Sequence, residues 1–293
     1  MKSGFVAILG RPNVGKSSIM NYMVGEKVAI VSDKAQTTRS KALGVLSRDG
    51  VQIVFVDTPG IHKPRTKLGE FMVKAAEDAK DGVDAIMVVV DGTFIGRGDE
   101  DVMKSIAGEK CPKFLVINKT DIVNPEQFMK RLSELDVSVF DQVISVSAKK
   151  GTNMEKLFEL LCACLPEGPE YFPKDMITDQ PERVLVAEII REKALRNLHD
   201  EIPHGIGVDI LQIAKIGNNL TEIHADVYCE RAAHKSMIIG HQGSMLSRIG
   251  SQAREDIEKM LGTKVMLRLW VKVREDWRNR KEDLRTLGYE EEK

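Results

Sequence analysis

The stretch of sequence that decides the fold is Gly10-Arg11-Pro12-Asn13-Val14-Gly15-Lys16-Ser17. It matches the phosphate-loop pattern G-x-x-x-x-G-K-[ST], and it directly follows the apolar run Phe5–Leu9. A strand that leads into a glycine-rich turn and then a helix points backbone N–H groups and the helix dipole at one place, where a phosphate is stabilised. The sequence therefore predicts a nucleoside triphosphate site near the start of the chain.

The residues of this loop have distinct predicted roles. Lys16 would neutralise the β- and γ-phosphates, and Ser17 would hold Mg²⁺ through its hydroxyl group. Gly10 and Gly15 allow backbone angles and a close approach that a Cβ atom would prevent. The other predicted nucleotide contacts here are Arg11, Pro12, Asn13, Val14 and Ser18.

Length and composition are those of an ordinary globular chain with two domains. The chain has 293 residues, of which 30% are charged and 42% hydrophobic, and a formal net charge of -1. Its four cysteines show no CxxC pair and no metal-ligand spacing with histidine, which favours reduced thiols and a cytoplasmic protein. No apolar stretch approaches the length of a membrane span, and the first strand leaves no room for a signal peptide. Any membrane contact would therefore be peripheral.

Apolar runs rich in β-branched residues alternate with stretches of helical periodicity in the first half of the chain. Strands buried on both faces of a parallel sheet have this composition. We therefore predict an α/β fold, a mostly parallel sheet covered by helices, with ligands at the carboxyl ends of the strands. The predicted strands are Phe5–Leu9, Val51–Val56, Ala85–Val90, Lys113–Ile117 and Val143–Val146, and the helical stretches include Leu68–Lys80, Asp99–Ala107 and Met154–Leu165.

A proline-rich stretch without periodicity divides the chain. It begins at Pro166, where a helical stretch ends, and runs to Pro181. We predict a nucleotide-binding domain over residues 1–168, a linker over 169–182 and an α+β second domain over 183–293. The order of the second domain is α-β-β-α-α-β, with elements at Val184–Leu198, Ile206–Ile216, Glu222–Cys229, either side of Gly240–Gly243, and Val265–Val273, followed by a charged helical segment at Asp276–Leu287.

The base of the nucleotide is predicted by Asn118-Lys119-Thr120-Asp121, which follows the strand that ends at Ile117. The Asp121 carboxylate can accept hydrogen bonds from N1–H and the exocyclic amine of guanine. Adenine has an acceptor at that ring nitrogen and lacks the amine, so it leaves buried polar groups unpaired. Asn118 would brace the base and the neighbouring loops, and Lys119 would lay its aliphatic stem along the ring. The alternative is an ordinary surface turn with the same letters.

Ser147-Ala148-Lys149 follows the next predicted strand and supplies the second half of a guanine pocket. The backbone N–H of Ala148 is expected to reach O6 of the base. Two motifs in this order make the choice of guanine specific, so the predicted ligand is GTP and not ATP.

Asp57-Thr58-Pro59-Gly60 closes the strand Val51–Val56 and is the predicted sensor of the γ-phosphate. Asp57 would reach Mg²⁺ through water, and the N–H of Gly60 would contact the γ-phosphate. Loss of that phosphate would release the loop, which is an order-to-disorder change.

A polar segment between the phosphate loop and this sensor, Ala35-Gln36-Thr37-Thr38-Arg39, is the candidate first switch. One threonine hydroxyl must complete the Mg²⁺ shell. We expect Thr38 to do so, with Thr37 as the close alternative.

In order along the chain, GRPNVGKS, QTTR, DTPG, NKTD and SA resemble the five signature motifs of translation-factor-class small GTPases. The resemblance implies GTP and GDP as ligands, Mg²⁺ as cofactor and hydrolysis of GTP. Ras-like members place a glutamine just after the third motif to orient the attacking water, but Ile61 stands there and its aliphatic side chain cannot do so. We therefore expect slow intrinsic turnover. The predicted catalytic residues are Lys16, Thr38, Asp57, Gly60 and Asn13.

Asn13 is a candidate to assist hydrolysis in place of the glutamine that Ras-like members have at the position of Ile61. In similar GTPases an asparagine at this place in the phosphate loop ligates K⁺. The ion sits where an arginine finger would lie and neutralises charge between the phosphates in the transition state. The alternative is a polar turn residue that tolerates unusual backbone angles.

The second domain contains a G-x-x-G loop, Gly240-His241-Gln242-Gly243, between two helical stretches. By itself such a loop is a weak signal. With the α-β-β-α-α-β order it resembles a type II KH domain, whose bare glycine backbone admits a single-stranded sugar-phosphate chain while about four bases lie in an apolar groove. The resemblance implies that this domain binds RNA.

The predicted RNA contacts surround this loop. Its apolar neighbours would wall the groove, although Ile249 equally fits a core position, and its basic neighbours would contact phosphates. A solvated helix face is the alternative for each basic residue taken singly. The predicted set is Lys235, Ile238, Ile239, Gly240, His241, Gln242, Gly243 and Arg248, with Ile249 and Arg254 nearby, and His241 and Gln242 have no assigned role.

A GTPase domain, a proline-rich linker and a C-terminal KH domain together resemble the bacterial Era GTPases, of the TrmE-Era-EngA type, over essentially the whole chain. The resemblance includes Asp175-Met176-Ile177-Thr178-Asp179 in the linker. It implies binding to the 3′ end of 16S ribosomal RNA and assistance in maturation of the 30S subunit. It also implies peripheral association of a cytoplasmic protein with the inner face of the membrane, and we expect no DNA partner. The sequence has no heptad seam, so a monomer is expected.

Two other functions stay open. The chain could be a membrane-associated signalling GTPase whose KH fold recruits protein partners, or an RNA-modifying enzyme that GTP controls. The enzyme interpretation lacks a second catalytic constellation, because the six histidines are scattered: His62, His199, His204, His224, His234 and His241. His62 lies beside Ile61 in the sensor loop, and we do not favour it as a general base.

Overall fold

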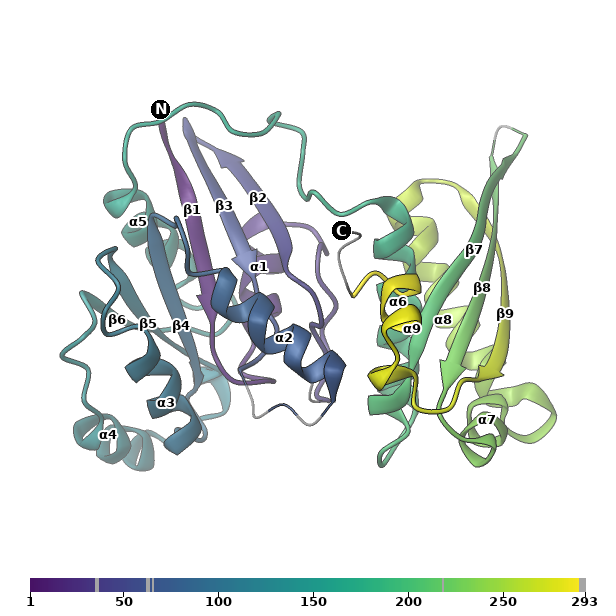
Figure 1. Ribbon diagram of the computed structural model, residues 1–293. Coiled ribbons are helices and arrows are strands. Elements are labelled where there is room, and N and C mark those ends of the chain that lie inside the picture. Colours follow the sequence, from purple (N-terminus) through teal and green to yellow (C-terminus); the bar gives the residue numbers. More distant parts are fainter. Residues whose placement is uncertain (35–36, 62–63, 65, 218, 290–293) are drawn as a thin grey trace. The chain divides into compact units, whose positions relative to one another are not determined.

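The computed structural model describes residues 1–34, 37–61, 64, 66–217 and 219–289. It divides into two compact units. Unit 1 holds the phosphate loop and the other nucleotide motifs, and unit 2 holds the chain from Gln180 onward together with two short segments, 32–37 and 64–71. Figure 1 shows the elements of both units. Among the described residues, no helix is long and apolar enough to cross a lipid bilayer.

Unit 1 is built on a six-stranded sheet with the strand order β2-β3-β1-β4-β5-β6 (Figure 1). Every neighbouring pair is parallel except β2 and β3, which are antiparallel. The predicted α/β fold with a mostly parallel sheet is therefore confirmed. The elements in this part of the chain are β1 (Lys2–Leu9), α1 (Lys16–Val24), β2 (Ala42–Arg48), β3 (Val51–Asp57), α2 (Lys67–Asp78), β4 (Ala85–Asp91), α3 (Arg97–Ser105), β5 (Lys113–Asn118), α4 (Pro125–Glu134), β6 (Gln142–Ser145) and α5 (Met154–Cys164).

The central strand β1 is buried on both faces. Val6 and Ile8 join a core that includes side chains of α1 and α5, whereas Ala7 and Leu9 join a second core that includes side chains of α3. Since successive side chains of a strand point to opposite faces, one continuous apolar run fills both cores. The strand therefore delivers the phosphate loop rigidly to the carboxyl edge of the sheet.

The edge strand β2 is missing from the sequence-based prediction. Of its seven residues only Gly44 and Val45 are buried, and the others are partly or fully exposed. An antiparallel edge strand with one solvated side lacks the long apolar run that identifies the parallel strands. The predicted Val143–Val146 is shifted by one residue, because β6 spans Gln142–Ser145.

The predicted linker is held against unit 1. The side chain of Gln52, which is fully buried in β3, accepts hydrogen bonds from the backbone N–H groups of Tyr171 (2.8 Å) and Phe172 (3.0 Å). Its amide nitrogen donates to the Phe172 carbonyl at 2.7 Å, and Val45 N–H donates to the Ile177 carbonyl at 2.9 Å. The linker up to Asp179 belongs to unit 1, and the predicted domain boundaries at 168 and 183 stay a prediction.

Unit 2 has the predicted order α-β-β-α-α-β. Its three-stranded sheet has the order β7-β8-β9, in which β7 and β8 are antiparallel and β8 and β9 are parallel. Side chains of α6, α7 and α8 share one core with one face of this sheet. The elements are α6 (Glu182–Asn197), β7 (Gly207–Ile216), β8 (Leu220–Cys229), α7 (Ala232–Ile239), α8 (Ser244–Leu261), β9 (Lys264–Val273) and α9 (Lys281–Thr286).

The expected single helical segment at Asp276–Leu287 is wrong in its extent. The structure has a short 3₁₀ turn at Trp277–Asn279 and then α9. Trp277 is fully buried, and its indole N–H donates to the Gly205 carbonyl at 2.9 Å. Anchoring this large side chain interrupts the helix.

Candidate nucleotide site and nucleic-acid groove

The phosphate loop depends on backbone conformations that favour glycine. Gly10 has φ 149° and Gly15, at the start of α1, has φ 100°. A Cβ on Gly15 would lie 2.1 Å from Nδ2 of Asn118, and a Cβ on Gly10 would lie 2.4 Å from the Val89 carbonyl oxygen. The loop therefore forms a bare backbone cradle beside the base-recognition motif.

Lys16 is the buried cation of this cradle. Its side chain is 5% exposed, and Nζ donates to the carbonyl oxygens of Gly10 (3.1 Å) and Arg11 (2.9 Å). Burial lowers the pKa of Lys16 to about 8, and the nearby Asp57 carboxylate opposes that shift. An anionic phosphate in the cradle would restore the favourable surroundings of the charged form.

The predicted Mg²⁺ ligands lie together around Asp57. Ser17 Oγ donates to Asp57 Oδ2 at 2.6 Å, Thr38 Oγ1 donates to the same oxygen at 3.3 Å, and the two hydroxyl oxygens are 3.0 Å apart. Asp57 is fully buried, and its Oδ1 has no hydrogen-bond partner among the described residues. Burial raises the pKa of the Asp57 carboxyl, although Lys16 and both hydroxyls oppose this. A buried set of oxygen ligands with an unsatisfied carboxylate fits a hard divalent cation.

The structure separates the two candidate switch threonines. Thr38 Oγ1 is in the cluster around Asp57, whereas Thr37 Oγ1 donates to the Lys34 carbonyl at 2.6 Å. This arrangement supports Thr38 over Thr37 as the ligand. Ala35 and Gln36 of the predicted switch, and His62, lie outside the described residues.

The sensor loop after β3 is fastened to the phosphate loop. Thr58 Oγ1 donates to the Ile8 carbonyl at 2.8 Å, and Ile61 N–H donates to the Gly10 carbonyl at 3.2 Å. A Cβ on Gly60 would lie 2.4 Å from the backbone nitrogen of Pro12, so Gly60 permits this close packing. The Ile61 side chain packs against the core on the α3 side of the sheet.

Asn118 joins the three parts of the nucleotide site. It is 3% exposed, its Nδ2 donates to the Val14 carbonyl at 3.0 Å, and its Oδ1 accepts the N–H of Ala148 at 3.1 Å. The Ala148 N–H, which is predicted to contact O6 of the base, donates to Asn118 in this structure, and its contact with the base stays a prediction. The Asn118 side chain therefore braces the phosphate loop and the loop that contains Ala148, as the sequence predicts.

The other base-recognition side chains are also held in place. Ser147 Oγ donates to Asp121 Oδ1 at 2.6 Å, and this hydrogen bond lowers the pKa of the exposed Asp121 carboxyl. Lys119 Nζ forms a 2.6 Å ion pair with Asp91, whose other oxygen accepts two hydrogen bonds from Thr93. The ion pair with Asp91 therefore fixes the position of the ammonium group at the end of the aliphatic stem of Lys119.

The remaining residues of the phosphate loop differ in their surroundings. Arg11 forms a 2.8 Å ion pair with the buried Asp99 and lies 5.7 Å from the ring centroid of Phe94, so its charge is directed toward α3. Val14 is 3% exposed and belongs to the core, which leaves its backbone for nucleotide contact. Asn13 is exposed with φ 65°, a left-handed conformation that both of its predicted roles accommodate.

In unit 2, the G-x-x-G loop connects α7 to α8 in left-handed backbone conformations. The φ angles are 74° at Gly240, 50° at Gln242 and 80° at Gly243. A Cβ on Gly240 would lie 2.7 Å from the Cβ of Met245, whereas a Cβ on Gly243 would have no heavy atom within 4 Å. Gly243 therefore leaves open space beside the loop.

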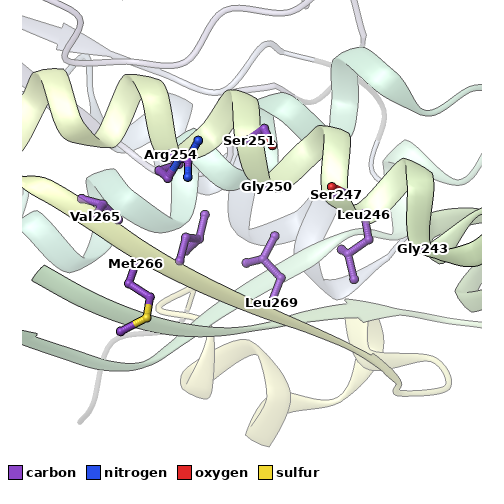
Figure 2. Close-up of a pocket in the computed structure, with 10 residues that line it drawn as sticks. Gly243, Leu246, Ser247, Gly250, Ser251, Arg254, Val265, Met266 and Leu269 are labelled. Atoms are coloured by element: carbon purple, nitrogen blue, oxygen red, sulfur yellow. The ribbon is translucent and has the colours of Figure 1, made fainter.

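A groove of about 520 Å³ begins at Gly243. Figure 2 shows α8 along one side of it and β9 along the other. The helix contributes one leucine, small residues and one cation, and the strand contributes apolar side chains. The lining residues are Gly243, Leu246, Ser247, Gly250, Ser251, Arg254, Val265, Met266, Leu267 and Leu269.

The residues that line this groove differ from those predicted to form its walls. Ile238 is fully buried and Ile249 is 1% exposed, and both belong to the core of unit 2. Ile239 and the predicted cations Lys235 and Arg248 do not line the groove, whereas Arg254 does. The useful signal in the sequence is the three- and four-residue spacing of Ser247, Gly250, Ser251 and Arg254, which places small residues and a cation on one face of α8.

Known proteins resemble the chain in both parts. The family model for 50S ribosome-binding GTPases matches residues 5–119, and the KH domain model matches residues 201–278. GTPase Era of Alkaliphilus metalliredigens is 53% identical over 293 residues, and GTPase Era of Alkaliphilus oremlandii is 52% identical over 292 residues; each alignment covers 99% of both chains.

Two solved structures resemble this one over 99% of both chains at 40% sequence identity. One is Era in complex with MgGDPNP and nucleotides 1506–1542 of 16S ribosomal RNA, with a TM-score of 0.94. The other is a variant of Aquifex aeolicus Era bound to GDP and AlF₄⁻, with a TM-score of 0.92.

Proposed function

Because the chain belongs to the Era family of GTPases, we propose that it is a GTP-controlled switch that binds the 3′ end of 16S ribosomal RNA and assists maturation of the 30S subunit. The observation that carries the proposal is the groove between α8 and β9, which opens at the G-x-x-G loop. The relative crystallised with nucleotides 1506–1542 of 16S ribosomal RNA supports the choice of RNA.

The nucleotide site is proposed to hold GTP or GDP with Mg²⁺. Lys16 compensates phosphate charge. The hydroxyl groups of Ser17 and Thr38 both donate to the buried Asp57 carboxylate, so these three oxygen ligands lie together. When bound, Mg²⁺ neutralises charge on the β- and γ-phosphate oxygens. Gly60, packed on the phosphate loop, is placed to sense the γ-phosphate. These roles are supported by the two crystallised relatives, which contain MgGDPNP and GDP with AlF₄⁻.

Hydrolysis is proposed to be slow and assisted by K⁺. Ile61 offers no polar atom to orient water, and its side chain packs into a core. Arg11 is occupied by Asp99, so it does not replace an arginine finger. Asn13 is exposed at the rim of the loop, where its amide oxygen can ligate a monovalent cation.

Exchanging KCl for NaCl is therefore expected to lower GTP turnover roughly 10-fold or more, because one electrostatic contact to the transition state is lost. Asn13→Ala should turn over slowly in both salts, with its GDP affinity little changed. The measurement is phosphate release at equal ionic strength. Equal turnover of the unmodified chain in both salts would contradict the proposal that K⁺ assists hydrolysis. Asn13 would then be a polar turn residue.

RNA is proposed to enter unit 2 along the G-x-x-G loop. The open space at Gly243 admits the sugar-phosphate backbone, and the apolar side chains of β9 face the bases. Arg254 lines the groove and is placed to compensate phosphate charge. Lys235 and Arg248 flank the loop outside the groove and stay predicted phosphate contacts.

Crosslinking in cells tests which partner the chain binds. The full chain locked with GTP is expected to recover the 3′ end of 16S ribosomal RNA, and Gly240→Asp with Gly243→Asp should abolish recovery by placing two carboxylates at the phosphate path. Gly243→Asp alone is the cleaner variant, because a Cβ on Gly240 would meet Met245, and Gly262→Asp is its matched control, since Gly262 also has a positive φ and open space but lies at the other end of α8. Recovery of no ribosomal RNA, or recovery that the double variant leaves unchanged, would favour the signalling GTPase with a protein-binding KH fold.

A further inference from the structure

The strand β9 presents two chemically different faces. Val265 and Val271 belong to the core of unit 2, and Leu267 and Leu269 pack against that core. Because side chains alternate along a strand, Arg268, Trp270 and Lys272 share the opposite face. Trp270 is 43% exposed, whereas the other tryptophan of the chain, Trp277, is fully buried.

The exposed tryptophan ring is braced from the side. His224 lies on the neighbouring strand β8, and the ring centroids of His224 and Trp270 are 5.3 Å apart at an interplanar angle of 75°. His224 Nε2 is in turn 2.9 Å from Oε1 of Glu222. An edge-on contact with a hydrogen-bonded histidine restricts the indole without covering it.

Two cations flank the ring, and their acidic partners lie beneath them. The Arg268 side chain is 54% exposed and pairs at 3.4 Å with Glu222, which is 18% exposed. The Lys272 side chain is 55% exposed and pairs at 2.6 Å with Asp226, which is 2% exposed. The surface that faces solvent is therefore an aromatic ring between two cationic side chains, each of which is more exposed than the carboxylate it pairs with.

The spacing of these cations suits a nucleotide chain. Arg268 and Lys272 are four residues apart on one strand, so their Cα atoms are separated by about 13 Å with Trp270 midway between them. A base can stack on the ring while phosphates on either side meet the two cations. A purely apolar partner would remove both ion pairs from water, which costs free energy that a phosphate chain does not require.

We propose that Arg268, Trp270 and Lys272 form a stacking site for an unpaired RNA nucleotide, distinct from the α8–β9 groove. The site adjoins the groove, because β9 is the edge strand of the sheet (Figure 1). Its Leu267 and Leu269 line the groove from the other face. One RNA strand can thus pass round the edge of β9. The inference rests on the proposed RNA-binding function for the identity of the ligand.

Tryptophan fluorescence tests the site, because Trp270 is exposed and Trp277 is not. Titrating the full chain with an unstructured twelve-nucleotide RNA is expected to quench the emission of Trp270. The quenching should persist in Gly250→Leu, in which a side chain fills the groove, and should disappear in Trp270→Phe. Quenching that Gly250→Leu abolishes would overturn the inference, since Trp270 would then only report on the groove.

Affinity gives an independent readout in the Gly250→Leu background. Trp270→Ala is expected to weaken RNA binding about 5- to 150-fold, whereas Trp270→Phe keeps most of the affinity. Arg268→Ala and Lys272→Ala should each reduce the slope of log affinity against log salt by about 0.7. Leu211→Ala, at another exposed apolar residue of the same sheet, is the matched control and should have no effect.

The outcomes separate this site from the proposed function. Groove-dependent RNA binding without quenching of Trp270, or equal affinity of Trp270→Ala and its parent, would overturn the stacking site and leave the groove intact. RNA binding at neither place would contradict the proposed function itself.

Discussion

Asp121→Asn is expected to weaken GDP binding by about 10³-fold or more and to create binding of xanthosine diphosphate. The carboxylate accepts hydrogen bonds from N1–H and the exocyclic amine of guanine, and an asparagine amide presents one acceptor and one donor instead. Xanthine carries a carbonyl oxygen where guanine carries the amine, so it pairs with the amide. Calorimetric titration with both diphosphates measures the change.

The fold should tolerate this substitution. Asp121 is exposed, and an asparagine oxygen can still accept the hydrogen bond that Ser147 Oγ donates at 2.6 Å. Asp136→Asn is the matched control, because Asp136 is likewise exposed and accepts a hydrogen bond from the N–H of Ser138 at 3.0 Å. Unchanged GDP affinity in Asp121→Asn would show that another residue selects the base.

The nucleotide site could be predicted largely from the sequence because its parts follow buried parallel strands. All six apolar residues Ala85–Val90 of β4 are fully buried, so burial on both faces appears in the sequence as an uninterrupted apolar run. The phosphate loop and the DTPG, NKTD and SA motifs start where strands of this kind stop. The phosphate loop also constrains its own backbone, since the positive φ of Gly15 requires a glycine there.

Hydrogen-bond partners between loops could not be predicted in the same way. The sequence predicts a contact between the Ala148 N–H and the base, but it does not predict that Asn118 accepts this N–H while the other end of the same side chain reaches the Val14 carbonyl. The choice of partner depends on the distance between three loops that are far apart in the sequence. Motif spacing along the chain contains no such distance.

The residues that wall the groove of unit 2 could not be predicted from the apolar pattern around the G-x-x-G loop. The sequence predicts that apolar residues around the G-x-x-G loop wall the groove, with a core position as the alternative for Ile249, but Ile238 and Ile249 both fill the core. Helical periodicity shows that such residues share a face, and it does not show which face a groove occupies. The groove is instead marked by small residues on α8, because Ser247, Gly250 and Ser251 line it without filling it.

Gly250→Leu is expected to remove RNA from the groove while unit 2 stays folded. A Cβ on Gly250 would lie 3.5 Å from Cδ1 of Leu269, which is ordinary contact, so Gly250→Ala should keep RNA affinity and should stabilise α8 by up to about 1 kcal/mol. A leucine extends further into the groove and takes the place of a base. The loss of one stacked base weakens binding about 5- to 150-fold.

The central claim is that this groove holds the 3′ end of 16S ribosomal RNA, and the most direct test is a dissociation constant measured by fluorescence anisotropy with a labelled RNA of that sequence. Gly108→Leu in unit 1 is the control, since its Cβ would have no heavy atom within 4 Å. We expect wild-type affinity for Gly250→Ala and Gly108→Leu, and about 5- to 150-fold weaker binding for Gly250→Leu with a melting temperature no lower than that of the wild type. Full affinity in a folded Gly250→Leu chain would contradict the claim that the groove holds this RNA.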